Sequence, residues 1–237
     1  MGRKSAKIAE KKGAADKARG QVYTRALKDV YKASKSGSGD VATNFLLRVA
    51  VERAKKFNVP KDNIEKAIKK GQGEGGANFE DISYEGYGPG GIAVFVEAST
   101  DNPTRTVANV RSYFRKCDGT LGTAGSLEFV FKRVAQFRIP SEGLSEDDLT
   151  LELIDAGAEE VDSEDGDFIV TGDMSHFGSI QEKLQEMGIT PDEASLVRIP
   201  LNFKEASGDT LEQHDRLITM LEEDDDVVSV YHNLDET

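Results

Sequence analysis

The stretch AEEVDSEDGDFIVT, residues 158–171, decides the fold class of this chain. It contains two short segments, 158–161 and 167–171, separated by the dipeptide Asp165-Gly166. Asp-Gly between two such segments is typical of a tight β-hairpin, because both turn residues accept positive φ values. The acidic DSEDGD could also suggest a calcium loop, but an EF-hand loop with its glycine at position six would begin at Val161, which has no carboxylate. The hairpin is therefore the prediction.

Helix and strand signals continue on both sides of this hairpin. Ser145 is a good N-cap residue, and Gly157 and Gly188 are suitable residues for ending helices. The predicted flanking elements are a strand at 134–139, a helix from Ser145 to Gly157, a helix carrying Phe177, Ile180, Leu184 and Met187, and a strand at 195–199. The order βαββαβ over residues 134–200 is that of a split-βαβ, ferredoxin-like domain.

Two incomplete α/β segments lie outside this domain. The first has a predicted strand at 92–98, a helix from Asn102-Pro103 to Cys117 and a strand at 127–131. The second has a helix at 211–221 and a strand at 227–231. Neither segment completes a sheet alone. We therefore predict that residues 77–133 and 201–237 form a second ferredoxin-like domain, with 134–200 inserted into it.

Residues 1–76 are predicted to be helical. Val22, Ala26 and Val30 repeat at helical spacing until the Ser/Gly run at 36–39. Further helices are predicted over 45–57 and from Pro60 to Lys70, with Gly71 as the C-terminal cap. Residues 1–20 have almost no bulky apolar side chain except Ile8, and we expect a mobile or loosely helical arm. The predicted fold class is α+β, with a helical domain of residues 1–76 followed by two α/β domains.

Charge divides the chain at the same place. Residues 1–76 contain 19 lysines and arginines against 8 aspartates and glutamates, a net charge of +11, whereas the other 161 residues contain 11 against 35, a net charge of −24. Clustered cations indicate binding of a polyanion, since neutralised phosphates release counterions. The alternative is a solvated helical surface. The predicted nucleic-acid-binding residues are Arg3, Lys4, Lys7, Lys11, Lys12, Lys17, Arg19, Arg25, Lys28 and Lys32.

Two tyrosines of the helical domain have two possible roles, base stacking or core packing. Tyr23 and Tyr31 could stack on nucleic-acid bases, but their helical spacing is more typical of a core.

Glycine-rich segments at 71–76 and 84–91 both match the pattern GxGxxG. A dinucleotide-binding turn must follow a strand and open a helix. The first segment follows a helix and is interpreted as a linker, and the second precedes the strand at 92–98 and is interpreted as a sharp turn. A third glycine-rich turn covers 119–125.

Glycine-rich turns and arginines together can hold an anion. If the turns at 84–91 and 119–126 lie near the helix that begins at Pro103, their amides and its arginines could bind a phosphate or a carboxylate. The residues of this possible anion or partner site are Gly88, Gly90, Arg105 and Arg111. The alternative is an arginine that bridges the two acidic domains.

Several segments together resemble the YebC/PmpR family. They are YEGYGPGG at 84–91, TDNPTRT at 100–106, GTLGTAGS at 119–126, GRKSAKI at 2–8, ARG at 18–20 and NVPKDNIEKAIKKG at 58–71. The resemblance implies a three-domain transcriptional regulator, with relatives that act in translation on ribosomes or in mitochondria. One departure is Ser5, where the family usually has a tryptophan, and its effect on the arm is left open.

No residue pattern indicates catalysis or metal binding. Ser99, Ser126 and Cys117 could act as nucleophiles, but none lies in a recognisable catalytic motif, and Cys117 falls in an apolar helical stripe. The acidic run 222–226 is typical of a solvated loop, with a cation or basic partner as the alternative. His176, His214 and His232 lack zinc-site spacing, and His214 is expected in a core. We predict no enzyme activity, metal, cofactor or small-molecule substrate.

The sequence also bounds location and function class. It has no apolar run long enough for a membrane span, no apolar signal segment and a lone cysteine, so we expect no membrane interaction and a cytoplasmic protein. The leading hypothesis is a DNA-binding transcriptional regulator. The alternatives are a translation factor bound to ribosomal RNA and a protein–protein adaptor that uses the acidic domains. The target sequence, the sign of regulation, the oligomeric state and the domain placement stay open.

Overall fold

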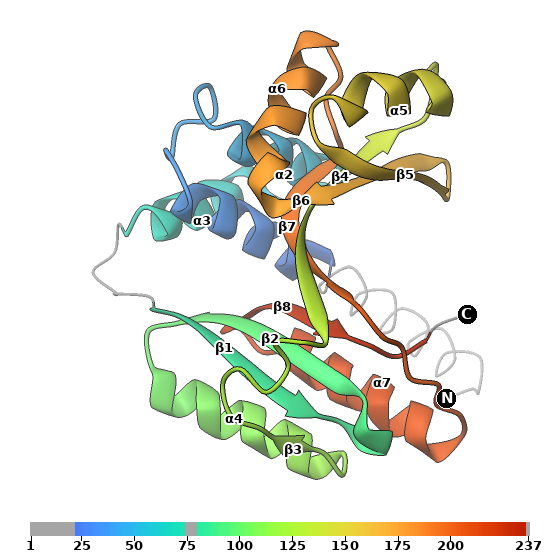
Figure 1. The fold of residues 1–237 in the computed structure, drawn as a ribbon. Helices are drawn as coiled ribbons and strands as arrows, with labels where there is room; N and C mark the ends of the chain where they lie inside the picture. Colours follow the sequence, from blue (N-terminus) through green and yellow to red (C-terminus); the bar gives the residue numbers. More distant parts are fainter. Residues whose placement is uncertain (1–21, 74–79, 236–237) are drawn as a thin grey trace, which may run out of the picture. The chain divides into compact units, whose positions relative to one another are not determined.

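The computed structural model describes residues 22–73 and 80–235, and the chain divides into two compact units, 1–76 and 77–237 (Figure 1). The described part of the first unit is helical. The second unit contains two four-stranded antiparallel sheets and their covering helices. The prediction of a mixed α and β protein that begins with helices is therefore confirmed.

The first unit consists of a helix at residues 22–35, α2 (Phe45–Lys56) and α3 (Lys61–Gly71). Asn44 begins α2, because its side-chain oxygen accepts a hydrogen bond from the backbone N–H of Leu47 at 3.1 Å. The small core between the helices includes Val30, Leu47 and Ala54, each of which is fully buried.

Gly71 has a different role from the predicted one. It is the last residue of α3, and the positive φ of 75° belongs to Gly73, so the prediction of Gly71 as the cap is wrong. A Cβ atom on Gly71 would lie 2.7 Å from the Cβ of Ser34 and 2.8 Å from the carbonyl oxygen of Tyr31. The glycine therefore allows α3 to pack closely against the helix at 22–35.

The first sheet of the second unit has the strand order β3-β1-β2-β8. Helices α4 and α7 pack on it through a core that includes Val96, Phe114 and Leu217. The elements are β1 (Glu80–Tyr87), η1 (Pro89–Gly91), β2 (Ala93–Thr100), α4 (Pro103–Lys116), β3 (Thr120–Leu121), α7 (Asp209–Glu222) and β8 (Val227–His232).

One prediction for this sheet is correct only in part, and a second is wrong. The first half of the glycine-rich segment 84–91 is not a turn, because residues up to Tyr87 belong to β1 and pair with β2, whereas Gly90 and Gly91 have φ values of 68° and 71° in the predicted turn. Glycine is required at position 86 of this strand, because a Cβ atom there would lie only 2.7 Å from the ring of Phe114. The predicted strand at 127–131 is also absent, since residues 124–130 form turns and Leu127 is buried within that connection.

The second sheet has the strand order β5-β6-β4-β7. Asp165 and Gly166 have φ values of 50° and 87°, so the hairpin prediction is confirmed. Helices α5 and α6 cover one face through an entirely apolar cluster. The elements are β4 (Phe131–Pro140), α5 (Glu146–Ile154), β5 (Ala158–Glu164), β6 (Asp167–Asp173), η2 (Met174–His176), α6 (Phe177–Glu186) and β7 (Glu193–Pro200).

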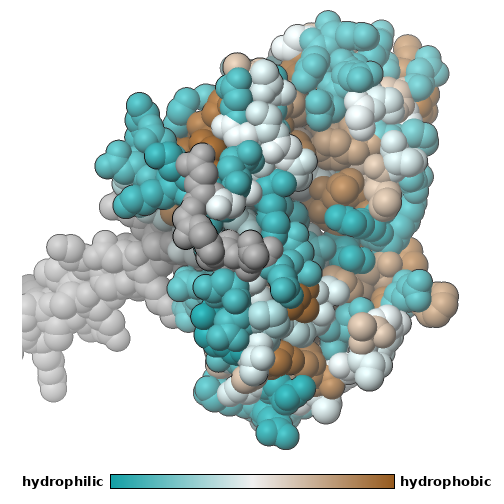
Figure 2. All heavy atoms as spheres, turned by 90° about the vertical axis from the view of Figure 1, so that its left-hand side faces the viewer, coloured by the Kyte–Doolittle hydropathy of each residue, from teal (hydrophilic) through white to brown (hydrophobic). Residues whose placement is uncertain are grey.

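One face of the molecule is mainly polar. Figure 2 shows a face covered largely by hydrophilic residues, with the hydrophobic residues in separate patches. Within residues 22–73 and 80–235, no helix combines the length and the apolar character needed to cross a membrane.

Candidate functional site

The predicted nucleic-acid-binding residues fall in two groups. Arg25, Lys28 and Lys32 lie on the helix at 22–35, where Arg25 is exposed and the two lysines are half-buried. The others lie outside the described residues, as does Ser5: these are Arg3, Lys4, Lys7, Lys11, Lys12, Lys17 and Arg19.

Helix α3 carries an exposed row of lysines that the sequence analysis did not include in the site. Lys61, Lys66, Lys69 and Lys70 are all exposed. Lys61 forms an ion pair with Glu65 at 3.6 Å, whereas no ion pair of Lys66 or Lys69 is found among the described residues. The segment NVPKDNIEKAIKKG contains four lysines, so its charge and its helical spacing were the available signal.

Tyr31 is not placed to stack on a base. Its side chain is buried, and the ammonium groups of Lys35 and Lys70 lie 5.8 and 5.5 Å from the ring centroid. These are cation–π contacts within the domain. Tyr23 is half-buried and packs against the same helical core. The stacking alternative is therefore wrong for Tyr31.

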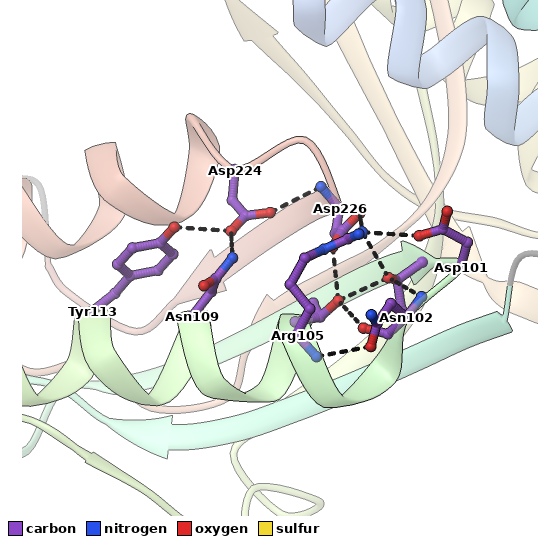
Figure 3. A network of polar contacts seen from close by, with 9 residues as sticks. Asp101, Asn102, Arg105, Asn109, Tyr113, Asp224 and Asp226 are labelled. Carbon is purple, nitrogen blue, oxygen red and sulfur yellow. Dashed lines mark hydrogen bonds and ion pairs between the residues drawn. The ribbon is translucent and has the colours of Figure 1, made fainter.

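Arg105 belongs to a polar network inside the second unit (Figure 3). It lies in the first turn of α4, and its guanidinium group contacts Asp226 at 2.8 Å and Asp101 at 2.9 Å. The hydroxyl of Thr106 also donates to Asp226, at 2.7 Å. Burial opposes ionisation of Asp226, but the hydrogen bonds from Arg105 and Thr106 outweigh it and hold the pKa of this carboxyl below its ordinary value.

Asp224 extends the network toward the end of α4. It accepts hydrogen bonds from the Tyr113 hydroxyl at 2.9 Å and from the Asn109 side-chain amide at 3.2 Å. Its other oxygen accepts the backbone N–H of Asp226 at 2.9 Å. Burial, together with the hydrogen bond to Asp224, raises the pKa of Tyr113 to about 12.

The acidic run 222–226 is therefore only partly a solvated loop. Asp224 and Asp226 are buried, and their carboxylates fasten the turn between α7 and β8 to α4. The solvated-loop prediction is wrong for these two residues. The groups that donate to Asp224, the Tyr113 hydroxyl and the Asn109 amide, lie more than a hundred positions earlier in the chain. Residue spacing within the acidic run therefore could not predict these hydrogen bonds.

The glycine-rich turns do hold a carboxylate, which comes from the chain itself. Glu85 of β1 is buried, and its two carboxylate oxygens accept the backbone N–H groups of Gly125 at 2.8 Å and Leu127 at 2.7 Å. The N–H of Gly122 donates to the backbone oxygen of Glu85 at 2.7 Å. Successive backbone amides are a good anion site, and here the anion is internal.

The four residues of the possible anion or partner site are not brought together. Gly88 and Gly90 precede β2, and a Cβ on Gly90 would lie 2.8 Å from Thr210 of α7. Arg105 lies at the far end of β2, beside Thr100. Arg111 is exposed on α4. Arg105 joins α4 to the acidic turn before β8, and both belong to the layer of sheet β3-β1-β2-β8, so these contacts of Arg105 do not bridge the two acidic domains.

His214 and Cys117 are core residues. His214 of α7 is 1% exposed and packs edge-on against His232, with ring centroids 4.8 Å apart. Burial lowers the pKa of His214 to about 4, and neither ring nitrogen has a hydrogen-bond partner among the residues that the structure describes. Cys117 is fully buried, and burial raises the pKa of its thiol. Among the described residues, no three His, Cys, Asp or Glu side chains form a group that could hold a metal ion.

Comparison with known proteins adds the family. Residues 3–74 match the description "TACO1/YebC protein N-terminal domain", and residues 79–234 match "TACO1/YebC second and third domain". The chain belongs to the TACO1/YebC family. The resemblance found in the glycine-rich and N-terminal motifs is thus confirmed.

TACO1/YebC relatives match over nearly the whole chain. A "Probable transcriptional regulatory protein" from Treponema denticola is 46% identical over 98% of this chain and 94% of its own length. One from Porphyromonas gingivalis is 46% identical over 91% and 90%. The crystal structure of a conserved hypothetical protein from Aquifex aeolicus has a TM-score of 0.75 and 36% identity, covering 92% of this chain and 90% of that one. These names support a regulatory role for the family.

Proposed function

We propose that this protein regulates gene expression by binding nucleic acid through residues 1–76, and that duplex DNA is its first candidate target. The contacts come from the cations predicted in the arm and the first helix, joined by the lysines of α3. The names of the relatives support a regulator of transcription. Catalysis has no part in this proposal, because Cys117 is buried in a core and the buried carboxylates bind groups of the chain itself.

The concentration of positive charge in the first unit carries the proposal. Its described part, residues 22–73, contains 12 lysines and arginines against 5 aspartates and glutamates. Lys66 and Lys69 project from α3 with no carboxylate partner in the described residues. Lysines in the last turn also suit the helix dipole, but that effect does not require four exposed lysines on one short helix.

The test compares two pairs of exposed cations, one on α3 and one on α4. Lys66→Gln with Lys69→Gln removes charge near the end of α3, and Arg115→Gln with Lys116→Gln removes the same charge in the last turn of α4. Affinity for a labelled DNA duplex is measured over a range of salt concentrations. The α3 variant should weaken binding at low salt and lower the slope of log K against log salt by about 1.8, since each phosphate contact contributes about 0.9.

The α4 variant should bind like the wild type. The proposal fails if the two variants behave alike or if the wild-type affinity does not depend on salt. It also fails if a chain that lacks residues 1–35 binds as well as the intact protein.

Ribosomal RNA is the second candidate target. Asn63 is the only exposed amide side chain in α3, and the other exposed polar groups of this helix are lysines, an aspartate and a glutamate. Lysines bind phosphate without reading bases, which suits structured RNA as well as DNA. Binding to ribosomes, structured RNA and promoter DNA should be compared at matched salt. Sedimentation with ribosomes without a DNA footprint would favour a translation factor.

The finer domain division belongs to the same proposal. We assign residues 77–133 with 201–237 to one ferredoxin-like domain and 134–200 to a second one inserted into it. In each sheet, two strands joined through a helix lie on either side of a third strand, β1 or β6, which supports the assignment. Limited proteolysis of the full chain should then cut preferentially near 130 and 203, and early cleavage inside α5 or α6 would contradict it.

A further inference from the structure

The second sheet and its helices carry a long segment without any cation. Residues 139–182 contain 14 aspartates and glutamates and no lysine or arginine. Some of these carboxylates have partners within the unit, such as Glu152 with Lys183, Glu159 with Lys132 and Glu164 with Arg138. Others are exposed and form no ion pair with any described residue: Asp147, Asp148, Asp155, Glu160 and Asp162.

Helix α5 exposes two large apolar side chains in the middle of this acidic surface. Leu151 is 71% exposed and Ile154 is 56% exposed. Leu151 and Ile154 lie three residues apart and are neighbours on one helix face. Asp147 lies one turn before Leu151, and Asp155 lies one turn after it. The outer face of α5 is therefore an apolar pair with a carboxylate at each end.

Helix stability accounts for only part of this arrangement. Three acidic residues lie in the first turn of α5, where the helix dipole favours negative charge. Asp155 lies at the C-terminal end, where the dipole disfavours it, although the charge of Lys183 on α6 interacts with it. Neither effect explains the exposed Leu151 and Ile154, and two adjacent large apolar side chains between carboxylates suit a binding surface.

We propose that the outer face of α5 binds a basic amphipathic segment of a partner protein. Two apolar side chains of the partner contact Leu151 and Ile154, and lysines or arginines on either side of them pair with Asp147 and Asp155. Charge complementarity decides the partner class, because this surface repels nucleic acid and other acidic proteins. The arm at residues 1–20 is basic, but its only bulky apolar residues are Met1 and Ile8, seven positions apart, so it cannot supply two such side chains at the spacing of Leu151 and Ile154.

The experiment uses the isotope-labelled full chain and a designed probe. The probe is a synthetic helical peptide with two leucines three residues apart, flanked by lysines, and the reference peptide has serines in place of the leucines. Binding is followed by NMR amide shifts and by fluorescence anisotropy. The leucine peptide should shift the amides of α5 and bind about tenfold more tightly than the serine peptide, because two apolar side chains leave water.

Variants assign the binding to this face. Leu151→Ser with Ile154→Ser should remove that tenfold preference without loss of folding, since both side chains are exposed. Asp147→Asn with Asp155→Asn should reduce the salt dependence of binding. The control is Leu201→Ser with Phe203→Ser, a pair with similar exposure of 59% and 62%, and it should bind like the wild type.

Three outcomes would overturn the proposal. The first is an equal affinity for the two peptides, and the second is a set of shifts that maps outside α5 and its neighbours. The third is self-association of the wild type that Leu151→Ser with Ile154→Ser abolishes in sedimentation, because the occupant would then be a second copy of this chain. None of these outcomes bears on nucleic-acid binding, which the α3 variants test separately.

Discussion

The two sheets of the second unit have the same spatial plan but different interiors. Besides its apolar core, the sheet β3-β1-β2-β8 encloses Glu85, Thr106, His214, Asp224 and Asp226, all of which are buried. The sheet β5-β6-β4-β7 buries no polar or charged side chain within residues 131–200. Both regions are rich in acidic residues, so composition alone does not separate them.

The difference lies in the groups that each carboxylate meets. In the first sheet, Arg105, Thr106, Tyr113 and backbone amides satisfy the buried carboxylates, which are therefore structural. In the second sheet the carboxylates lie outside the core, where some pair with Lys132, Arg138 or Lys183 and others are exposed. Stability should thus depend on single acidic residues in the first sheet and hardly at all in the second.

The largest effect is expected for Asp226→Ala. This change removes one of the two carboxylate partners of Arg105 and one acceptor of the buried Thr106 hydroxyl, and should lower the free energy of unfolding by about 3 kcal/mol. Asp162→Ala, at an exposed position of β5, should change it by less than about 0.5 kcal/mol. Urea denaturation of both variants is the measurement, and equal effects would remove the distinction between the sheets.

The lowered pKa of Asp226 also predicts how the free energy of unfolding changes at acid pH. The pKa of Asp226 is lower in the folded protein than its ordinary value. Its contribution to stability is therefore present above the unfolded-state pKa of about 3.9 and is lost as the pH falls through the folded-state value. Asp226→Ala should consequently lose less stability than the wild type when the pH is lowered below 4.

A smaller effect is expected from His214, which acts at a higher pH. In the unfolded chain His214 binds a proton near its ordinary pKa of 6.5, whereas in the folded protein it resists protonation until about 4. Stability should therefore fall by about 2 kcal/mol between pH 7 and pH 5. His214→Leu should remove this part of the pH dependence. Denaturation of both proteins at the two pH values measures it, and unchanged pH dependence would contradict the assignment.

The smallest effect is expected for Tyr113→Phe. This variant keeps the ring and removes the hydrogen bond to Asp224, and should cost about 1 kcal/mol. Tyr87→Phe, at a side chain that is 40% exposed, is the matched control and should be neutral. Thermal unfolding followed by circular dichroism compares the two. An equal cost would show that the Asp224 end of the network adds nothing to the fold.

Local signals predicted most helices and strands of the chain. Ser145 begins α5 and Asn102 begins α4 through the side-chain hydrogen bonds that their sequence positions indicate. The hairpin at Asp165-Gly166 forms because those residues accept the φ values that a tight turn requires. In each case neighbours in the sequence supply the interaction that fixes the structure.

The errors occurred where a distant partner overrides the local preference. The segment with four glycines at 84–91 is typical of a turn, yet its first half pairs with β2, and Gly86 is needed there to admit Phe114. Leu127 has an apolar strand-like context, but the bonds of Gly125 and Leu127 to Glu85 hold the segment in turns. Neither contact has a signature in the adjacent residues.

The candidate sites also include features that the sequence predicts and features that only the folded structure reveals. The excess of cations in residues 1–76 is a property of the sequence, and so is the acidic character of the remainder. The positions of Lys66 and Lys69 on an exposed helix face also follow from helical spacing. Sequence spacing does not predict the polar network of α4 with the turn before β8, which contains Arg105, Tyr113, Asp224 and Asp226. The two segments are far apart in the sequence of the second unit and meet only in the folded structure.

The sequence by itself determined the family, the α+β class, most element boundaries and the separation of charge, because these depend on residue identity and on neighbours within a few positions. Only the tertiary structure decided which carboxylates are internal and which remain available to a partner. Burial and hydrogen bonding determine whether a carboxylate is structural, and both come from chain segments that meet only after folding.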